Sequence, residues 1–365
     1  MKRLIKHSLI LLIAGFLLLP VYSFAEEDAT ISGKASVIVR TVDGERESAK
    51  FEEYREIPDG LSGEAEFKYK GNEGYFLKFK AKDIVEDDQY FNLKAGKYGK
   101  YRIEMGYDKL PHRFAYDAKT LYAGVGSGTL VLSDAMQTNL QSSTSSTDLA
   151  NRIKDFFTGA SETDLELFRK TGRGNVDIMV FDPFNLKIEF SREERDGTRP
   201  FTGAFGFGNA IELPEPIDYD TTQLKVIGSY TKKPLYLSAT YYLSKFKNNI
   251  DTLTWDNPYR VTDSTTSTAY SQTYAAGPSK GLIDLYPDNI YHNLSFSGSL
   301  MELPLRSRLS ANASWGWMKQ DDELVPYTTN TAIIPGAANN PPFDASNIAN
   351  LPVRNVDAKV NTYLY

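Results

Sequence analysis

The sequence contains no cysteine and only three histidines among 365 residues. Without cysteine it can form no disulfide, no thiolate metal site and no haem attached through a C-x-x-C-H sequence. His7, His112 and His292 are too few for a histidine-rich metal centre or a bis-histidine haem chain. No G-x-S-x-G, Walker or Rossmann motif occurs in a strand-to-helix context. We therefore expect no enzyme, and no cofactor or metal bound by this chain itself.

An excess of basic charge is also missing. The chain has 41 Lys and Arg against 47 Asp and Glu, for a formal net charge of -6. This balance argues against a nucleic-acid partner, because binding to phosphate backbones requires a basic surface. Beyond the N-terminal segment there is no run of 18 apolar residues, so the sequence predicts no transmembrane helix.

The N-terminal segment has the organisation of a signal peptide. Basic residues precede the apolar run Leu9–Leu19, and small residues lead up to Ala25. An uncleaved anchor is the alternative, but the run is short and the acidic Glu26–Asp28 follows it. We expect residues 1–25 to be removed by cleavage after Ala25. Residues 26–50 would then form an N-terminal periplasmic segment or a first strand.

Most of the remaining chain alternates between apolar and polar residues. Ala65–Lys70 and Tyr75–Lys82 place apolar and charged side chains in turn, and Gly71–Gly74 lies between them, which predicts a β-hairpin. The same period returns at residues 101–107, 186–191, 235–243, 294–297, 305–317 and 356–364. We count roughly ten or eleven strands of about eight to eleven residues, the length at which a tilted strand crosses a bilayer.

Alternation alone fits both a secreted β-sandwich or adhesin and a membrane barrel. Export, long regular strands and the large number of aromatic residues (23 Tyr, 20 Phe and 3 Trp) favour the barrel, whose interfacial girdles are aromatic. We therefore predict an all-β protein, an antiparallel transmembrane β-barrel of the outer membrane formed by residues 51–365.

The connections between strands fall into two kinds. Short junctions such as Gly71–Gly74 suit periplasmic turns, and the polar stretches Asp251–Asp288 and Gln320–Arg354 suit long outer loops. Leu132–Gly174 differs, because a Ser/Thr-rich tract is followed by apolar residues at helical spacing, among them Leu149, Leu165 and Phe168. It predicts an excursion between strands with one or two short helices.

In such a barrel the charged positions of the strands would face the lumen, which would be a polar wall of mixed charge. The alternative for each position is a solvated face without a partner. The candidates are Lys78, Lys80, Arg102, Glu104, Lys187, Glu189, Arg306, Arg308, Asp357 and Lys359.

Two short motifs have competing interpretations. Pro111-His112 could meet a haem or cytochrome surface, but a turn proline beside a hydrogen-bonding histidine is the simpler interpretation. Glu86-Asp87-Asp88 could bind calcium, but it lacks the ligand spacing of a recognised loop, so we expect a solvated acidic turn.

Short segments distributed along the chain carry a family resemblance. They are residues 51–56, 59–60, 87–90, 96–99, 107–112, 120–126, 191–197, 212–219, 244–248, 255–258, 286–289, 320–322 and 326–327. In their order and spacing over about residues 45–365 the sequence resembles the MtrB/PioB family of outer-membrane barrels. The positions that carry the resemblance include Tyr54, Arg55, Gly60, Asp88, Gln89, Tyr107, Pro111, His112, Thr120, Gly124, Gly126, Arg192, Asn257 and Pro258.

The resemblance implies a function in electron transfer. Family members look like wide barrels in the lipid of the outer membrane that enclose a periplasmic multihaem c-type cytochrome, and an extracellular multihaem cytochrome is a further implied partner. The haem would belong to the partner. A barrel of ten or eleven strands is too narrow for such a guest, so we expect this sequence to be an N-terminal part of a longer, otherwise incomplete barrel. From the residues alone, a general diffusion porin or solute channel without a cytochrome remains the alternative.

Overall fold

The computed structural model describes residues 29–41, 48–57, 59–204, 210–263, 278–331, 333–337, 342 and 348–361, with no side-chain placement for Ala204, Asp321 and 348–361. The predicted signal peptide, residues 1–25, lies outside the described residues. The first strand begins at Thr30, so the segment expected at 26–50 contains a strand.

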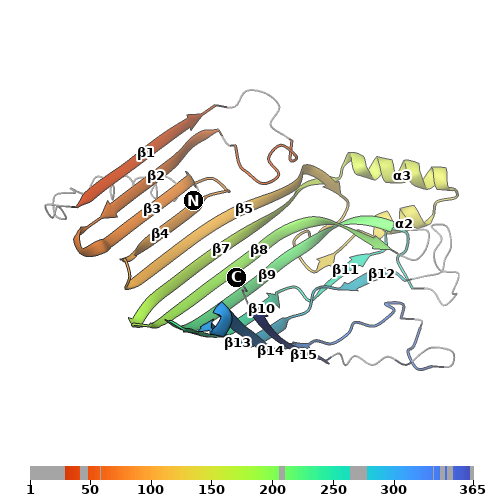
Figure 1. Ribbon diagram of the computed structural model, residues 1–365. Helices are drawn as coiled ribbons and strands as arrows, with labels where there is room; N and C mark the ends of the chain where they lie inside the picture. Colours follow the sequence, from red (N-terminus) through yellow and green to blue (C-terminus); the bar gives the residue numbers. More distant parts are fainter. Residues whose placement is uncertain are drawn as a thin grey trace.

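Twelve strands form one antiparallel sheet in which each strand pairs with the next in sequence order (Figure 1). The strands are β1 (Thr30–Arg40), β2 (Gly60–Lys70), β3 (Tyr75–Ile84), β4 (Tyr90–Lys97), β5 (Tyr101–Thr120), β7 (Ser161–Phe181), β8 (Phe184–Ala204), β9 (Ala210–Lys232), β10 (Leu235–Asn248), β13 (Asn289–Leu303), β14 (Ser307–Asp321) and β15 (Ile348–Asn361). The all-β antiparallel prediction and the hairpin of β2 and β3 are confirmed. Within the described residues the sheet is open between β1 and β15.

The two ends of the sheet differ in their connections. At the end that we call the turn end, adjacent strands are joined by a few residues, including the 3-10 turns η2 (Asn72–Gly74) and η3 (Pro304–Arg306). At the opposite loop end lie the longer connections, residues 41–59, 121–160, 249–288 and 322–347. Outer-membrane barrels have short periplasmic turns and longer outer loops, so we expect the turn end to be periplasmic.

The four central strands are much longer than expected. β5, β7, β8 and β9 have 20, 21, 21 and 23 residues, whereas about ten residues cross a bilayer. The expectation of roughly ten or eleven strands of about eight to eleven residues was therefore too low in number, and the expected length holds for β1 to β4 but not for the strands of this sheet from β5 onward. The additional length lies toward the loop end, where these strands extend beyond the membrane.

In the turn-end half of the sheet, one face is apolar and exposed. The cross-strand register places its side chains on the same side from β4 to β14. It includes Leu93, Met105, Ile178, Phe190, Leu237, Phe296 and Trp315, which are between 36% and 58% exposed. A continuous exposed apolar surface of this kind is the lipid-facing band of a membrane barrel, and we call it the lipid face.

Toward the loop end the polarity of the two faces inverts, as β9 shows most clearly. Leu224 and Val226 lie on the lipid face, but further up the same face the strand carries the acidic Asp218. On the opposite face Leu213 and Ile217 are 1% and 3% exposed. The inner face is thus polar at membrane depth and apolar above it, where other parts of the chain cover it.

A small cap provides that cover. It consists of the three-stranded sheet β6 (Thr129–Leu130), β11 (Thr252–Asp256) and β12 (Lys280–Asp284), with helices α2 (Asp134–Gln141) and α3 (Ser146–Thr158) nearby at the loop end (Figure 1). Leu130, Leu253 and Trp255 of the cap form a hydrophobic core with Leu213 of β9. The cap therefore lies on the inner face of the wall.

The two helices confirm part of the predicted excursion. Ser133 and Ser145 cap them by accepting hydrogen bonds from Met136 N and Asp148 N. The expected extent of 132–174 was wrong, since β7 begins at Ser161 and the buried Leu165 is a strand residue. No helix among the described residues combines the length and the apolar character needed to span a membrane.

Candidate functional site: the inner wall, the rim and the cap

The inner wall is the polar face opposite the lipid face. Across it, Lys78, Lys94, Glu104, Asn175, Glu189 and Lys225 are successive cross-strand partners from β3 to β9. The predicted lumen residues that share this face are Lys78, Lys80, Arg102, Glu104, Lys187, Glu189 and Arg308. Asp357 and Lys359 pair in register with Asn312 and Ser310, whereas Arg306 lies in the turn η3 and not on a strand.

Charges of opposite sign alternate along the central part of this wall. Lys94 Nζ lies 3.0 Å from Glu104 Oε1, and Arg102 Nη2 lies 3.1 Å from Asp177 Oδ2. Lys187 and Lys225 both contact Glu189, the latter at 3.8 Å. Because most of these side chains are partly exposed, the pairs add little stability. They make the wall polar and of mixed charge.

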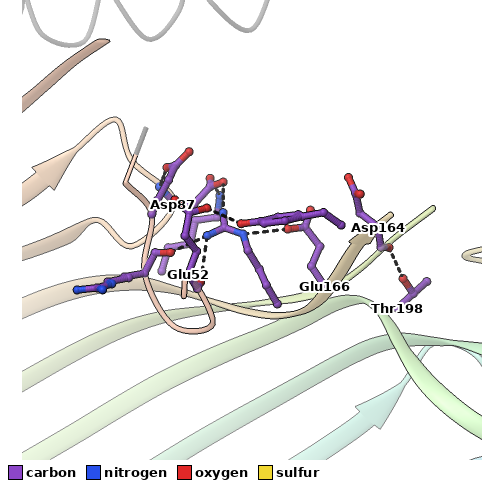
Figure 2. A network of polar contacts seen from close by, with 10 residues as sticks. Glu52, Asp87, Asp164, Glu166 and Thr198 are labelled. Atoms are coloured by element: carbon purple, nitrogen blue, oxygen red, sulfur yellow. Dashed lines mark hydrogen bonds and ion pairs between the residues drawn. The ribbon is translucent and has the colours of Figure 1, made fainter. Parts of the chain in front are cut away.

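At the rim, above the lipid face, a buried arginine joins four parts of the chain (Figure 2). The Arg113 side chain on β5 is 5% exposed and lies 3.3 Å from Asp87 Oδ2 and 3.3 Å from Glu166 Oε2. Its Nη1 also donates to the carbonyl oxygens of Arg55, at 2.7 Å, and Glu52, at 3.5 Å. Arg113 therefore fixes residues 52–55, the β3–β4 connection and β7 to one point.

Two carboxyl groups at the rim have pKa values that are raised by burial. Burial raises the pKa of Glu166, although the charge of Arg113 and its hydrogen bond act in the opposite direction. Glu86, 3% exposed, also has its pKa raised by burial and contacts Arg40 at 3.3 Å. The expectation of a solvated turn at Glu86-Asp87-Asp88 is wrong, because Glu86 is buried and Asp87 pairs with Arg113 and Lys109.

The same region explains Pro111-His112. These residues lie inside β5 and not in a turn, so that expectation was wrong. On the β4 side of β5, Lys109 N donates to Gln89 O and Arg113 N donates to Glu53 O, each at 3.0 Å. Pro111 lies between these two bonds. Proline has no backbone N–H to donate, and at this position no carbonyl oxygen of a neighbouring strand needs one. The segment around Glu53 thus covers an edge that the shorter β4 leaves open.

His112 makes the contacts of a structural histidine. Its ring stacks on Tyr54 with centroids 4.6 Å apart, and its Nε2 lies 3.2 Å from Tyr54 Oη. The expected hydrogen bond of His112 is present. Seven of the family-motif positions gather in this rim, namely Tyr54, Arg55, Asp88, Gln89, Tyr107, Pro111 and His112.

The other family-motif positions mostly lie in the cap. Gly124 and Gly126 have φ of 88° and 84°, and a Cβ on Gly124 would lie 2.3 Å from Thr129 O, so this tight turn requires glycine. Gln137 Nε2 of α2 donates to the carbonyl oxygens of Asn257 and Arg260, both at 2.8 Å. Thr120 is buried, and Pro258 borders the hollow between α3 and β9.

Asp256 holds the cap together. Its Oδ2 accepts from Leu132 N at 2.9 Å, its Oδ1 lies 2.9 Å from Lys280 Nζ, and its carbonyl oxygen accepts from Tyr122 Oη at 2.7 Å. Beside it, the Trp255 ring packs against Gly203 and Gly281. A Cβ atom added at these glycines would lie only 2.8 Å and 2.2 Å from the ring. These two glycines allow the indole to fill the space between β8 and β12.

Two family-motif positions lie elsewhere. Gly60 starts β2 with φ of 119°. Arg192 lies on the lipid face of β8, just above Phe190, and contacts Asp220 at 3.0 Å and Glu194 at 3.3 Å. A charged belt therefore replaces the apolar band where the wall leaves the membrane.

Sequence reasoning missed Arg113 and the Arg199–Glu215 pair and gave no role to Asp256, although Glu215 and Asp256 lie in the resemblance segments 212–219 and 255–258. In this pair Glu215 is 2% exposed and accepts from Arg199 Nε at 2.6 Å and Nη2 at 3.0 Å. The sequence did contain a signal for this pair. Glu215 alternates with Leu213 and Ile217 and so lies on the same, buried face of β9, where a charged residue requires a partner. Among the described residues no group of three or more His, Cys, Asp or Glu side chains could hold a metal ion.

A family model and a known outer-membrane protein match this sequence. The family model described as outer membrane beta-barrel porin, MtrB/PioB, matches residues 43–365. Outer membrane protein MtrB of Shewanella baltica (strain OS185) is 28% identical over 263 residues, which are 72% of this chain and 34% of that protein. The chain thus spans about a third of the length of this relative.

Solved structures with similarity include OmpT of Vibrio cholerae, an outer-membrane protein. Its outer-membrane expressed form aligns at 11% identity and a TM-score of 0.32, over 71% of this chain and 56% of that one. Its in-vitro folded form aligns at 10% identity and a TM-score of 0.32, over 81% and 65%. Since the family model covers most of the sequence, this chain belongs to the MtrB/PioB family of porin-like outer-membrane β-barrel proteins.

Proposed function

We propose that this protein is part of an outer-membrane sheath that encloses a periplasmic multihaem c-type cytochrome and so supports electron transfer across the membrane. The observation that carries the proposal is the pairing of an exposed apolar face with a polar inner wall of mixed charge on the same strands. A sheath needs these two surfaces, one that matches lipid and one that accepts a protein guest.

The haem would belong to the guest. The chain has no cysteine for attachment, and aromatic neighbours engage both His112 and His292. His112 stacks on Tyr54, and His292 stacks on Trp317 with centroids 4.9 Å apart. His292 is also on the lipid face, because it pairs in register with Leu243 and Trp317.

The loop end would be the place for a second partner. Long strands and the cap extend the wall beyond the membrane on the side opposite the periplasmic turns. An extracellular multihaem cytochrome that received electrons there would contact the rim and the cap. A protein guest also requires a wider barrel than twelve strands provide, in keeping with the longer chain of the relative.

The test is to purify the tagged native protein from outer membranes in mild detergent and to measure the haem absorbance and the mass of the complex. We expect c-type haem to copurify in stoichiometric yield, and the native barrel to conduct few ions in planar bilayers because its lumen is filled. A haem-free barrel that conducts ions would contradict the sheath and indicate a general diffusion porin.

A further inference from the structure

Positive charge is concentrated on one side of the inner wall. On β2 to β5 the inner face carries Lys68, Lys70, Lys78, Lys80, Lys82, Lys94 and Arg102, which we call the cationic lane. The carboxylates of the same face are Glu64, Glu66, Glu104 and Asp108, and Asp108 lies 3.3 Å from Arg173 of β7. This excess of cations is notable in a chain whose formal net charge is -6.

The opposite part of the wall carries almost no charge. At membrane depth the inner face of β10, β13 and β14 presents small polar residues, Ser238, Thr240, Ser295, Ser297, Asn312 and Ser314. Between the two parts, β7 to β9 carry paired charges such as Lys225 and Glu189. The wall therefore changes from cationic, through neutralised, to uncharged around the lumen.

The centre of the cationic lane has like charges as direct neighbours. Lys78 is the cross-strand partner of Lys68 on one side and of Lys94 on the other, an arrangement that destabilises a sheet. Lys68 contacts Glu66, and Lys94 contacts Glu104 at 3.0 Å. Lys78 is exposed and makes no ion pair with a carboxylate of the described residues. Its charge is available to a ligand in the lumen.

The lane adjoins a hollow at the turn end. A cavity of about 740 Å³ opens on the inner face, bordered by Lys78, Lys94, Lys100, Arg102 and Asp177. From β2 to β4 the lane is about 10 Å wide, and from Lys78 to Lys82 it is about 13 Å long, given usual strand spacings. This area matches a patch of protein surface better than a single small anion.

We infer that the cationic lane is the docking strip for an acidic surface of the protein enclosed by the barrel. This inference rests on the proposed sheath function. It adds which part of the inner wall contacts the enclosed protein and which charge that protein presents there. Carboxylates of the guest would neutralise the row Lys68, Lys78 and Lys94, while the uncharged side of the wall would contact the guest loosely. The guest would then sit off-centre in the lumen with a fixed rotation about the barrel axis.

The test uses charge reversal in the native complex. The double variant Lys78→Glu/Lys80→Glu reverses the charge at two central positions of the lane, and Lys245→Glu/Lys247→Glu makes the same charge change on the exposed outward face of β10, above the lipid face. The ratio of haem to barrel is measured after capture at increasing NaCl concentration, together with the amount of folded barrel from its heat-modifiable gel mobility.

We expect the lane variant to retain the haem protein about tenfold more weakly, since like charges now face each other, and the β10 variant to behave like the wild type. Equal retention by the lane variant at every salt concentration would overturn the docking strip while leaving the sheath intact. A wild-type barrel without haem would instead contradict the sheath itself. If the lane variant does not fold, Lys78→Gln/Lys80→Gln replaces it, and an unchanged salt profile for that variant also overturns the inference.

Discussion

Arg113 is a charge held almost entirely out of water, and such a charge is tolerated only while its partners surround it. Here the partners are Asp87, Glu166 and two backbone carbonyl oxygens of the 52–55 segment. These partners come from three different parts of the chain, namely the 52–55 segment, the β3–β4 connection and β7. The rim therefore depends on one side chain more than on any of the surface ion pairs nearby.

Replacing this arginine by a methionine of similar length should weaken the rim. Arg113→Met leaves Asp87 and Glu166 close together without a cation, so we expect a loss of about 3 kcal/mol or more in unfolding free energy. Urea unfolding in detergent micelles, with limited trypsin cleavage within residues 48–57, measures the effect. Lys119→Met is the matched control on the same strand. Its pair with Glu162 at 3.9 Å is exposed, so its loss should change stability by less than about 1 kcal/mol.

Glu166 lies above the membrane-spanning part of β7 and should make stability depend on pH. Because burial raises its folded-state pKa, the folded protein holds this proton more tightly than the unfolded chain. The resulting stability is present below the unfolded pKa and is lost as the pH rises through the raised folded pKa.

Glu166→Gln should remove this part of the pH dependence, measured as urea midpoints at several values between about pH 4 and 7. Glu162→Gln, at an exposed position of the same strand, serves as the control and should keep the wild-type slope. An unchanged slope in Glu166→Gln would show that this carboxyl titrates normally.

At the scale of elements, the main feature is the inversion of polarity along single strands. On β9 the apolar residues occupy even positions from Leu224 to Tyr230 and odd positions from Ile211 to Tyr219. The lower half matches lipid outside, and the upper half matches the cap inside. One continuous strand thus serves two environments without a bulge in its register.

Adjacent residues on β8 offer a direct test of the two faces. Phe190 is on the lipid face and Ser191 is on the inner wall, where it is the cross-strand partner of Gln223. Phe190→Lys should cost about 2 to 4 kcal/mol near the bilayer midplane and should reduce the amount of folded barrel in outer membranes. Ser191→Lys should fold normally. The reverse result would show that the faces are assigned the wrong way round.

The sequence predicts some of these elements well and others poorly, for physical reasons. The hairpin of β2 and β3 follows from local alternation and a glycine turn, so it is readable from residues 60–84 alone. The sequence pattern at Leu165 and Leu167 is interpreted as helical because the helix α3 precedes them. They lie in the loop-end half of β7, where the apolar residues are on the inner face and no longer on the lipid face. Arg113 could not be identified, since its partners are 26 to 61 residues away.

At the scale of the whole molecule, the turn end and the loop end should lie on opposite sides of the membrane. The chain has no cysteine, so a single introduced cysteine can be labelled without background from other thiols of this chain. Lys100 in the β4–β5 turn and Lys154 on α3 are both exposed. We expect a membrane-impermeant maleimide to label Lys154→Cys in intact cells and Lys100→Cys only after the outer membrane is permeabilised. Labelling of Lys100→Cys alone in intact cells would reverse the orientation.

The pairing within the cap also has a consequence for the order of assembly. The parallel bridge between β6 and β11 joins Thr129 to Thr254, and β12 follows only at Lys280. Contacts between positions so distant in sequence form late, because the intervening chain must first be ordered. The hairpins from β1 to β10 can therefore form before the cap packs against the inner face of the wall.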